Sequence, residues 1–462
     1  RPRTVTLIPA GEAPLSHEFR ARFAATFARH ARTLVVTPED AKKILKSAAC
    51  SSEATSRLNA LERDYDTVLF VADDTLTPWS EKAINHADLV IAAAPHDGDE
   101  RLNALETRAA EALEPDARRL VLLHPTQTRV RGTARWLARR DGVMHHHVAL
   151  DTDDDIERLY RFVSGTARGL VACGGGAFCA AHIGVYKALT EAGLTFDIMG
   201  GTSGGSAMTA AFLLTGDPDE MDEVVHDMFV THKALRRYTW PRYSLVDHSN
   251  FDEQLQRHFG GPDIEDLWLP FFAVSTNLSR YTLNVHARGP LWTAIRASAA
   301  IPVLLPPVYT RDGEMLVDGC LLDNVPIKHM HDLKSGPNVV VSFDLPELER
   351  FEVDYETLPA RRQLLKQALN PFRRTPLPPA PGLSAVLMRS LMANRHNYTR
   401  DITGGDLLLV PTFPADMGLL DWHRHREMLD RAYDWTRAEV GRLASNGGHP
   451  ALDGIFPAAS RS

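Results

Sequence analysis

Over residues 3–165, short apolar runs alternate with longer stretches whose apolar and polar positions follow a helical period. The apolar runs predict strands at Val5–Pro9, Thr33–Thr37, Thr67–Ala72, Ala87–Ala93 and Arg119–His124. Stretches such as Glu18–Arg29 and Asp99–Ala112 predict helices between them. Strands that are joined by helices form parallel sheets with helices on both faces. We therefore expect residues 1–165 to form a smaller, Rossmann-like α/β domain.

The turn after the first predicted strand lacks a nucleotide-binding motif. A nucleotide would normally bind there, yet residues 9–14 read Pro-Ala-Gly-Glu-Ala-Pro. The turn has neither the Gly-Lys-Ser/Thr of a phosphate-binding loop nor the three glycines of a dinucleotide turn. We expect a structural or regulatory accessory domain that holds no cofactor.

Three consecutive histidines, His145–His147, follow the last of these strands. Neighbouring side chains on a strand point to opposite faces, so the three rings cannot converge on one metal ion. We interpret this run as a surface strand and expect no metal site.

A second strand–helix pattern begins near Gly169, after a helix that starts within Asp151–Ile156. It predicts a second α/β domain over residues 166–444, with a central, mostly parallel sheet and helices on both faces. Within it, residues 370–381 are proline-rich and carry Arg373 and Arg374, which predicts an exposed loop. Residues 445–462 are expected to form a loose C-terminal tail.

Composition narrows the class of protein. The chain has 462 residues, 44% of them hydrophobic, which is ordinary for a globular protein of two domains. Its net charge of −8 argues against a nucleic-acid partner. Four cysteines do not make a disulfide framework, so we expect a reducing, cytoplasmic location. No apolar run reaches the roughly 18 residues of a spanning helix, and the start at Arg1 suggests a fragment or a processed chain.

The strongest chemical signal is the Gly-x-Ser-x-Gly run at Gly201–Gly205. It lies between a predicted strand, Phe196–Gly200, and a predicted helix, Ser206–Leu214. A serine on such a turn is held in a strained backbone with its hydroxyl projecting, and glycines at Gly201 and Gly205 avoid clashes with neighbouring backbone. We predict that Ser203 is a nucleophile.

One strand–helix unit earlier, Gly174, Gly175 and Gly176 follow the predicted strand Gly169–Cys173. Their unhindered amides suit an oxyanion hole. The competing interpretation is a dinucleotide turn, because Gly174 and Gly176 begin like one. The third glycine is replaced by Cys179, however, and the next strand does not end in an acidic ribose ligand.

The candidate base is Asp318, at the end of the apolar run Met315–Val317 and directly before Gly319. A carboxylate that ends an apolar strand lies at a sheet edge, where clefts form, and burial there would raise its basicity. A plain Asp-Gly turn between strands would give the same pattern.

Taken together, these motifs resemble the patatin-like phospholipases, in the branch of neuropathy target esterase and its bacterial relatives. The resemblance covers nearly the whole chain, including the α/β region before the catalytic domain. The blocks that carry it are Cys173–Cys179, Ala181–Val185, Gly201–Gly205, Ile264–Pro270, Arg296–Ala299, Leu305–Pro307, Asp318–Cys320 and Asn324–Pro326.

The resemblance implies a Ser–Asp dyad without histidine that cleaves phospholipid or lysophospholipid esters. It assigns Ser203 as the nucleophile and Asp318 as its general base. The amides of Gly174, Gly175, Gly176 and Ala177 would form the oxyanion hole. The implied partner is a lipid; no cofactor is implied, and the oligomeric state stays open.

The chain departs from the family pattern at four positions. Phe178 replaces an arginine, Cys179 and Cys320 replace glycines, and Gly204 stands where this branch usually has isoleucine. These changes leave open a weakened enzyme, a redirected specificity or an inactive scaffold. Most free cysteines are buried small hydrophobes, although a redox-sensitive site is an alternative.

Other interpretations use the same residues. A Ser-Asp-His triad would take His423 or His425 as its base, according to chain order. Acyl transfer to an alcohol would use the same dyad as hydrolysis. Basic and aromatic residues mix over residues 233–243, which suits either peripheral membrane contact or an ordinary solvated loop.

Overall fold

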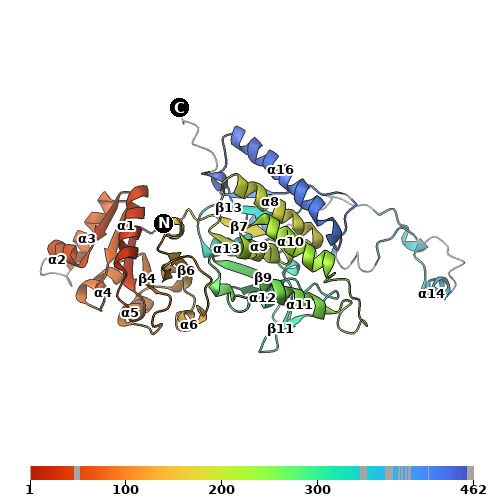
Figure 1. Ribbon diagram of the computed structural model, residues 1–462, viewed down its shortest axis with the longest axis horizontal. Coiled ribbons are helices and arrows are strands. Elements are labelled where there is room, and N and C mark those ends of the chain that lie inside the picture. Colours follow the sequence, from red (N-terminus) through yellow and green to blue (C-terminus); the bar gives the residue numbers. More distant parts are fainter. Residues whose placement is uncertain are drawn as a thin grey trace.

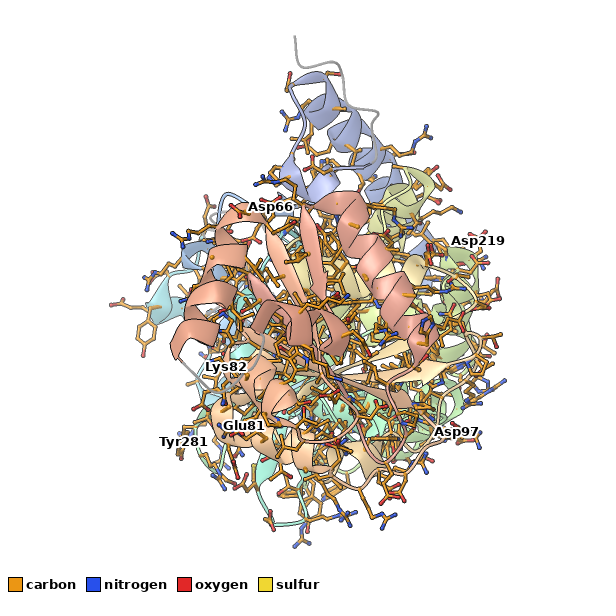
Figure 2. The ribbon with its side chains drawn as sticks, turned by 90° about the vertical axis from the view of Figure 1, so that its left-hand side faces the viewer. Asp66, Glu81, Lys82, Asp97, Asp219 and Tyr281 are labelled. Carbon is orange, nitrogen blue, oxygen red and sulfur yellow. The ribbon has the colours of Figure 1, made fainter. Side chains whose placement is uncertain are left out.

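The computed structural model describes residues 2–45, 52–343, 351–369, 378–382, 386, 389–390, 393, 397–414 and 416–454. These residues form two units, each built around one sheet, which lie side by side along the long axis of the molecule (Figure 1). Viewed from the N-terminal unit, Asp97, Asp219 and Tyr281 lie at the outline of the molecule (Figure 2). None of the helices within the described residues is long and apolar enough to cross a membrane.

The N-terminal sheet has six parallel strands in the order β2-β3-β1-β4-β5-β6. They are β1 (Thr4–Pro9), β2 (Thr33–Val36), β3 (Thr67–Val71), β4 (Leu89–Pro95), β5 (Arg118–His124) and β6 (Met144–Ala149). The helices are α1 (His17–His30), α2 (Pro38–Leu45), α3 (Ser52–Asp64), α4 (Pro78–Asn85), α5 (Ala104–Ala112), α6 (Ala134–Leu137) and α7 (Asp154–Ser164). Apolar side chains of α1 and α7 cover one face, and those of α4, α5 and α6 cover the other. The predicted parallel sheet with helices on both faces is therefore present.

The turn after β1 is closed by the chain's own side chains. The Gly11 amide donates to Glu106 Oε2 at 3.0 Å. Glu106 is buried and forms an ion pair with buried Arg140, at 2.7 Å. Asn103 caps α5 and donates to the carbonyls of Pro9 and Gly11, so this helix starts at Ala104 rather than at the predicted Asp99. The Glu106 carboxylate thus accepts a hydrogen bond from the Gly11 amide, which a phosphate bound at this turn would otherwise use.

The C-terminal sheet has the order β11-β12-β9-β8-β7-β13-β14, with β10 paired to β9. Its strands are β7 (Gly169–Ala172), β8 (Ile198–Thr202), β9 (Phe271–Asn277), β10 (Thr282–His286), β11 (Val308–Tyr309), β12 (Met315–Asp318), β13 (Asn338–Val341) and β14 (Asp406–Leu409). The pairs among β7, β8, β9, β13 and β14 are parallel, whereas β10, β11 and β12 add antiparallel pairs at one side. The sheet is mostly parallel, as predicted.

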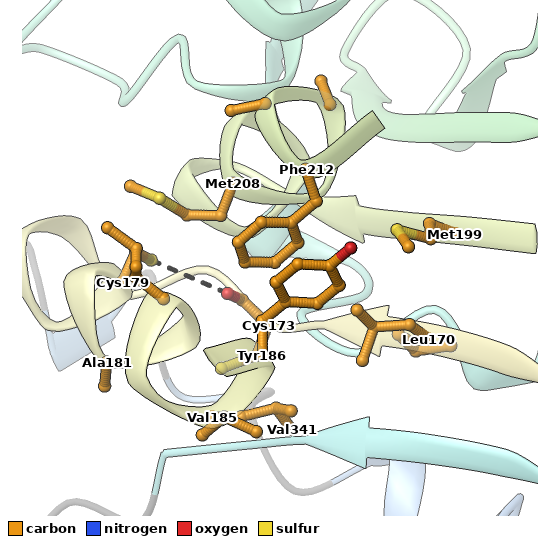
Figure 3. Packing of buried hydrophobic residues seen from close by; sticks show 14 of the residues in the cluster. Leu170, Cys173, Cys179, Ala181, Val185, Tyr186, Met199, Met208, Phe212 and Val341 are labelled. Carbon is orange, nitrogen blue, oxygen red and sulfur yellow. Dashed lines mark hydrogen bonds between the residues drawn. The ribbon is translucent and has the colours of Figure 1, made fainter. Parts of the chain in front are cut away.

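Helices cover both faces of this sheet (Figure 1). They are α8 (Ala181–Glu191), α9 (Gly204–Thr215), α10 (Pro218–Val225), α11 (His248–Phe259), α12 (Leu291–Ser298), α13 (Ile327–Leu333) and α16 (His425–Ser445). A further helix, α14 (Arg361–Leu369), lies away from the sheet (Figure 1). In the core, the rings of Tyr186 on α8 and Phe212 on α9 stack with their centroids 3.9 Å apart (Figure 3). This packing fixes α8 and α9 beside β7 and β8, whose carboxyl ends hold the candidate site.

The histidine run is a strand, as predicted, but it does not lie on the surface. β6 is the last strand of its sheet, and residues of the C-terminal unit cover the side of β6 that has no neighbouring strand. His145 and His147 each place Nε2 2.9 Å from the carbonyl oxygen of Glu265. His147 also stacks near Trp268, with ring centroids 5.8 Å apart. The prediction of a surface strand was wrong because the covering residues come from a distant part of the chain.

Part of the predicted C-terminal tail packs against the C-terminal unit. Ala451 and Leu452 are buried in the core of the C-terminal unit, and Arg168 donates to the carbonyl of Asp453. Ala451 and Leu452 therefore anchor this end of the chain, while residues 446–448 are exposed and 455–462 lie outside the described residues. The predicted proline-rich loop falls largely outside them too, since residues 370–377 are not described.

Candidate active site

Ser203 occupies a strained turn between β8 and α9. Its φ is 53° and its ψ is −128°, a left-handed backbone conformation that residues other than glycine rarely adopt. The Ser203 amide donates to Ser298 Oγ at 2.8 Å, and Ser298 Oγ donates to the Val274 carbonyl at 2.6 Å. The Ser203 carbonyl accepts from Ser206 Oγ at 2.7 Å. These hydrogen bonds stabilise a strained backbone conformation at Ser203. Such strain is typical of turns in functional sites.

The glycines on either side of Ser203 are needed for close packing against β7. A Cβ at Gly201 would lie 2.6 Å from the Ala172 carbonyl oxygen. A Cβ at Gly205 would lie 2.3 Å from the same oxygen and 2.4 Å from that of Cys173. Such distances are shorter than any relaxed contact, so the turn can approach β7 only with glycine at both positions.

Asp318 is the group that meets the Ser203 hydroxyl. Ser203 Oγ donates to Asp318 Oδ2 at 2.6 Å, and both side chains are buried. The other carboxylate oxygen, Oδ1, accepts from the Cys320 amide at 2.9 Å. Burial raises the pKa of Asp318, and the hydrogen bonds from Ser203 and Cys320 offset part of that rise. A buried carboxylate with a raised pKa is a stronger proton acceptor than an exposed one.

The glycine loop lies next to this pair, and its amides differ in what they bind. Gly174 donates to Asn324 Oδ1 at 3.0 Å, and Ala177 donates to the Leu419 carbonyl at 2.8 Å. The Gly175 amide faces the Cys179 sulfur, which is a weak acceptor. Gly176, with φ at +57°, lines the same cavity as Ser203. The predicted loop therefore stands beside the serine, with two of its four amides already bound elsewhere.

Asn324 links the glycine loop to the aspartate turn. It is buried, and its Oδ1 accepts from both the Gly174 amide and Cys320 Sγ, each at 3.0 Å. Its Nδ2 donates to the Gly174 carbonyl at 3.4 Å. In the sequence, Asn324 and Ser298 stand out only as members of blocks that resemble the family. Their roles depend on partners 150 and 95 residues away, so no local pattern could have shown them.

The cysteines in the two motif blocks are buried. Cys179 Sγ donates to the Cys173 carbonyl at 3.7 Å, the dashed line in Figure 3. Burial raises the pKa of the Cys179 and Cys320 thiols well above the ordinary value, and the negative charge of Asp318 adds to the effect. Thiols that stay protonated react slowly, which favours a packing role over a redox one.

Phe178 lies inside the protein. It is 5% exposed, and its ring meets that of Phe413 edge-on with centroids 5.0 Å apart. Phe343 contacts Phe413 in the same way. The side chain that replaces the family's arginine is therefore packed in an aromatic cluster and offers no charge to a substrate headgroup.

An apolar cavity opens at Ser203 and Gly204. It runs between α9, α10, α11 and α12 and holds about 50 Å³ of free space. Its walls are almost entirely hydrocarbon and sulfur, with contributions from Met208, Met221, Met228, Phe251, Leu255 and Ile295. An apolar cavity that ends at a nucleophile suits a substrate with a long aliphatic part.

The histidines considered for a triad lie elsewhere. His425 is buried at the start of α16, where Nδ1 contacts the Trp422 carbonyl at 2.9 Å and Nε2 lies 3.1 Å from Asp222. His423 is exposed in the preceding turn. Among the described residues, the side chain that is hydrogen-bonded to Ser203 Oγ is that of Asp318.

In comparisons with known proteins, two family models match successive parts of the chain. Residues 170–331 match the family described as Patatin-like phospholipase, and residues 2–169 match the Neuropathy Target Esterase family P-loop like domain. "Patatin-like phospholipase domain-containing protein 7" of Rattus norvegicus is 30% identical over 351 residues, covering 68% of this chain and 26% of that protein. "Lysophospholipase NTE1" of Coccidioides immitis is 28% identical over 451 residues, covering 84% of this chain and 28% of that protein.

This chain thus spans about a quarter to a third of the length of these relatives. Among solved structures, VipD from Legionella pneumophila matches with a TM-score of 0.31 and 15% identity, over 59% of this chain and 66% of that one.

Proposed function

We propose that this chain, which belongs to the patatin-like phospholipase family, is a serine acyl hydrolase that cleaves carboxylic ester bonds of phospholipids or lysophospholipids. The observation that carries the proposal is the 2.6 Å hydrogen bond from Ser203 Oγ to Asp318, beside an apolar cavity that Ser203 lines. Serine is a poor nucleophile unless a base takes its proton, and the buried carboxylate is placed to do so.

In the proposed reaction, Ser203 Oγ attacks the ester carbonyl carbon while its proton passes to Asp318 Oδ2. The resulting oxyanion is stabilised by the Gly175 and Gly176 amides and by the N-terminus of α9. We leave Gly174 and Ala177 out of this set because their amides donate to Asn324 and Leu419. Asp318 then protonates the departing alcohol oxygen, and the acyl group stays on Ser203.

Water completes the cycle. Asp318 takes a proton from a water molecule that attacks the acyl carbon, and the same proton returns to Ser203 Oγ as the fatty acid leaves. No histidine is needed, because one carboxylate accepts and returns each proton in turn. Only the ionised form of Asp318 can start either half-reaction.

The apolar cavity is the proposed acyl site. Its walls are almost entirely apolar, which suits the aliphatic part of an acyl group. Met208, Met221 and Met228 line it, and methionine is unbranched and adapts easily to a new shape. We therefore expect the cavity to accept one aliphatic chain rather than a bulky, branched acid.

The direct test compares Ser203→Ala and Asp318→Asn with the native chain on a panel of lysophospholipids and phospholipids. Each variant should lose about 10³-fold or more of kcat, because the nucleophile or its base is missing. A fluorophosphonate probe should label the native chain and not Ser203→Ala. The matched control is Ser445→Ala, at the exposed end of α16, which should react normally.

Two results would contradict the proposal. If the native chain neither hydrolyses any ester nor takes the probe, the alternative of a non-catalytic scaffold is favoured. If an added alcohol receives the acyl group in preference to water, the chain is an acyltransferase that uses the same two residues.

A further inference from the structure

One surface segment has a charge opposite to that of the whole chain. Residues 233–246, between α10 and α11, contain four basic residues and no acidic one, although the net charge of the chain is −8. Three aromatic side chains in the segment stand in solvent: Tyr238 is 75% exposed, Trp240 86% and Tyr243 76%. We call residues 233–246 the basic–aromatic loop. In Figure 1 its neighbours α10 and α11 lie on the side of the C-terminal unit away from the N-terminal unit.

The ends of this loop are fixed to the core. The Ala234 amide donates to the Met228 carbonyl at 3.0 Å, and the Asp247 amide donates to the Arg237 carbonyl at 2.7 Å. The Thr239 amide donates to the Leu245 carbonyl at 3.0 Å and closes the loop on itself. The exposed aromatic side chains are therefore held outward by a hydrogen-bonded frame, and do not result from a frayed segment.

The basic side chains of the loop are largely uncompensated. Lys233, Arg236, Arg237 and Arg242 are exposed, and the ion pairs found in the described part of the chain include none of them. Arg237 faces the carboxylate of Asp247, which caps the start of α11. Arg242 lies over the Tyr243 ring, 5.4 Å from its centroid. The loop thus presents a local positive potential that an anionic partner would neutralise.

The loop also adjoins the apolar cavity that Ser203 lines. Leu235, at its base, lines that cavity. The amides of Leu245 and Val246 donate to the carbonyls of Val303 and Leu304, at 2.8 and 3.0 Å. The adjoining Ile301 and Leu305 line the cavity from the other side. A partner that covers the loop would therefore also cover the neighbourhood of the cavity.

We propose that the basic–aromatic loop docks this chain on the surface of a bilayer that contains anionic lipids. Tyr238, Trp240 and Tyr243 would enter the headgroup region, where amphipathic rings are stable, and the basic side chains would contact lipid phosphates. A second copy of the chain fits poorly, because a symmetric contact would oppose the same four positive charges. The docking rests on the loop alone; its link to ester hydrolysis rests on the proposed function.

The first test is flotation of the whole chain with vesicles of phosphatidylcholine, with or without phosphatidylglycerol. Binding should require the anionic lipid and should weaken as salt is raised, because screening reduces the attraction. Emission from Trp240 should be quenched by brominated lipid, and the quenching should be lost in Trp240→Phe. Binding that ignores lipid charge, or equal quenching in both proteins, would overturn the proposal.

Variants separate the loop from the rest of the surface. Arg236→Glu combined with Arg242→Glu should lower the vesicle partition coefficient about tenfold or more, and Trp240→Ala should also lower it. The matched control is Arg63→Glu, an exposed arginine on α3 of the N-terminal unit, which should bind as the native chain does. All of them should keep the far-UV circular dichroism spectrum and thermal unfolding midpoint of the native chain, which shows that they are folded.

The other outcomes are distinct. Loop variants that bind vesicles as well as the native chain would overturn the docking surface. So would variants that change self-association without vesicles, which would indicate a second copy as the partner. If vesicle binding follows the prediction but no ester is cleaved, only the proposed function is contradicted.

Discussion

Two of the residues that set this chain apart from its family, Cys179 and Gly204, lie in close contact beside the nucleophile. A Cβ on Gly204 would lie 2.6 Å from Cys179 Sγ and 3.0 Å from its Cβ. The family resemblance places glycine at position 179 and isoleucine at 204, so this chain has exchanged the large and the small residue. Because interiors are close-packed, a side chain at position 204 would need a smaller residue at position 179. Packing against Cys179 therefore accounts for the glycine at position 204.

A double-mutant cycle tests this exchange. Gly204→Ile should clash with Cys179 and lower both ester hydrolysis and stability, by about 1–3 kcal/mol, as overpacking does. Adding Cys179→Gly should restore much of the loss, giving a coupling free energy of about 1 kcal/mol or more from thermal or denaturant unfolding. Additive effects of the two substitutions would show that the pair is not coupled.

At the residue scale, the sequence predicted the candidate nucleophile and base, but not the side chains that surround and position them. The turn at Ser203 could be predicted because glycines flank a serine between a strand and a helix. The network of Asn324, Ser298 and Leu419 could not, because each contacts its partner across a long loop of chain. Nor could the sequence tell which amides of the glycine loop have other acceptors. These depend on distances that only the folded chain sets.

Between elements, the contact of α8 with α16 depends on one glycine. Gly184 lies where the two helices cross, and a Cβ there would be 2.1 Å from the Leu429 carbonyl oxygen and 2.7 Å from the Tyr433 amide nitrogen. α8 follows the glycine loop directly, so its position helps to fix that loop. Close backbone approach, rather than flexibility, is the reason for glycine here.

We expect Gly184→Val to push α16 away from α8 and to lower the free energy of unfolding by about 3 kcal/mol or more. The matched control is Gly441→Ala, on α16, where a Cβ meets open space. It should leave stability unchanged or raise it by up to about 1 kcal/mol, since alanine favours a helix. A denaturant series on both variants makes the comparison; equal effects would contradict this account of Gly184.

At the scale of the whole molecule, a cluster of histidines joins the two units. His124 Nε2 and His147 Nδ1 are 3.0 Å apart, and His145 and His147 both contact the Glu265 carbonyl of the other unit. Burial lowers the pKa of His124 and His145 to about 4, and that of His147 in the same direction. Neutral rings therefore hold this interface.

The pH dependence of stability follows from these shifts. Unfolded histidine has a pKa of about 6.5, so between there and about 4 the unfolded chain binds protons that the folded interface excludes. The contribution of the cluster is present above the unfolded pKa and is lost as the pH falls. Thermal unfolding midpoints should drop from about pH 7 to about pH 5, and less steeply in a His124→Gln, His145→Gln double variant. Equal slopes would exclude the cluster as the cause.

By itself, the sequence determined the two α/β patterns, the strained serine turn, the glycine loop and the aspartate that ends an apolar strand. Each of these is local: alternating polarity sets an element, and glycine sets a turn within a few residues. Tertiary structure alone decided that Ser203 meets Asp318, 115 residues away, and that β6 is covered rather than exposed. It also decided that the basic–aromatic loop borders the cavity. Contacts between distant segments depend on how whole elements pack, which no local pattern encodes.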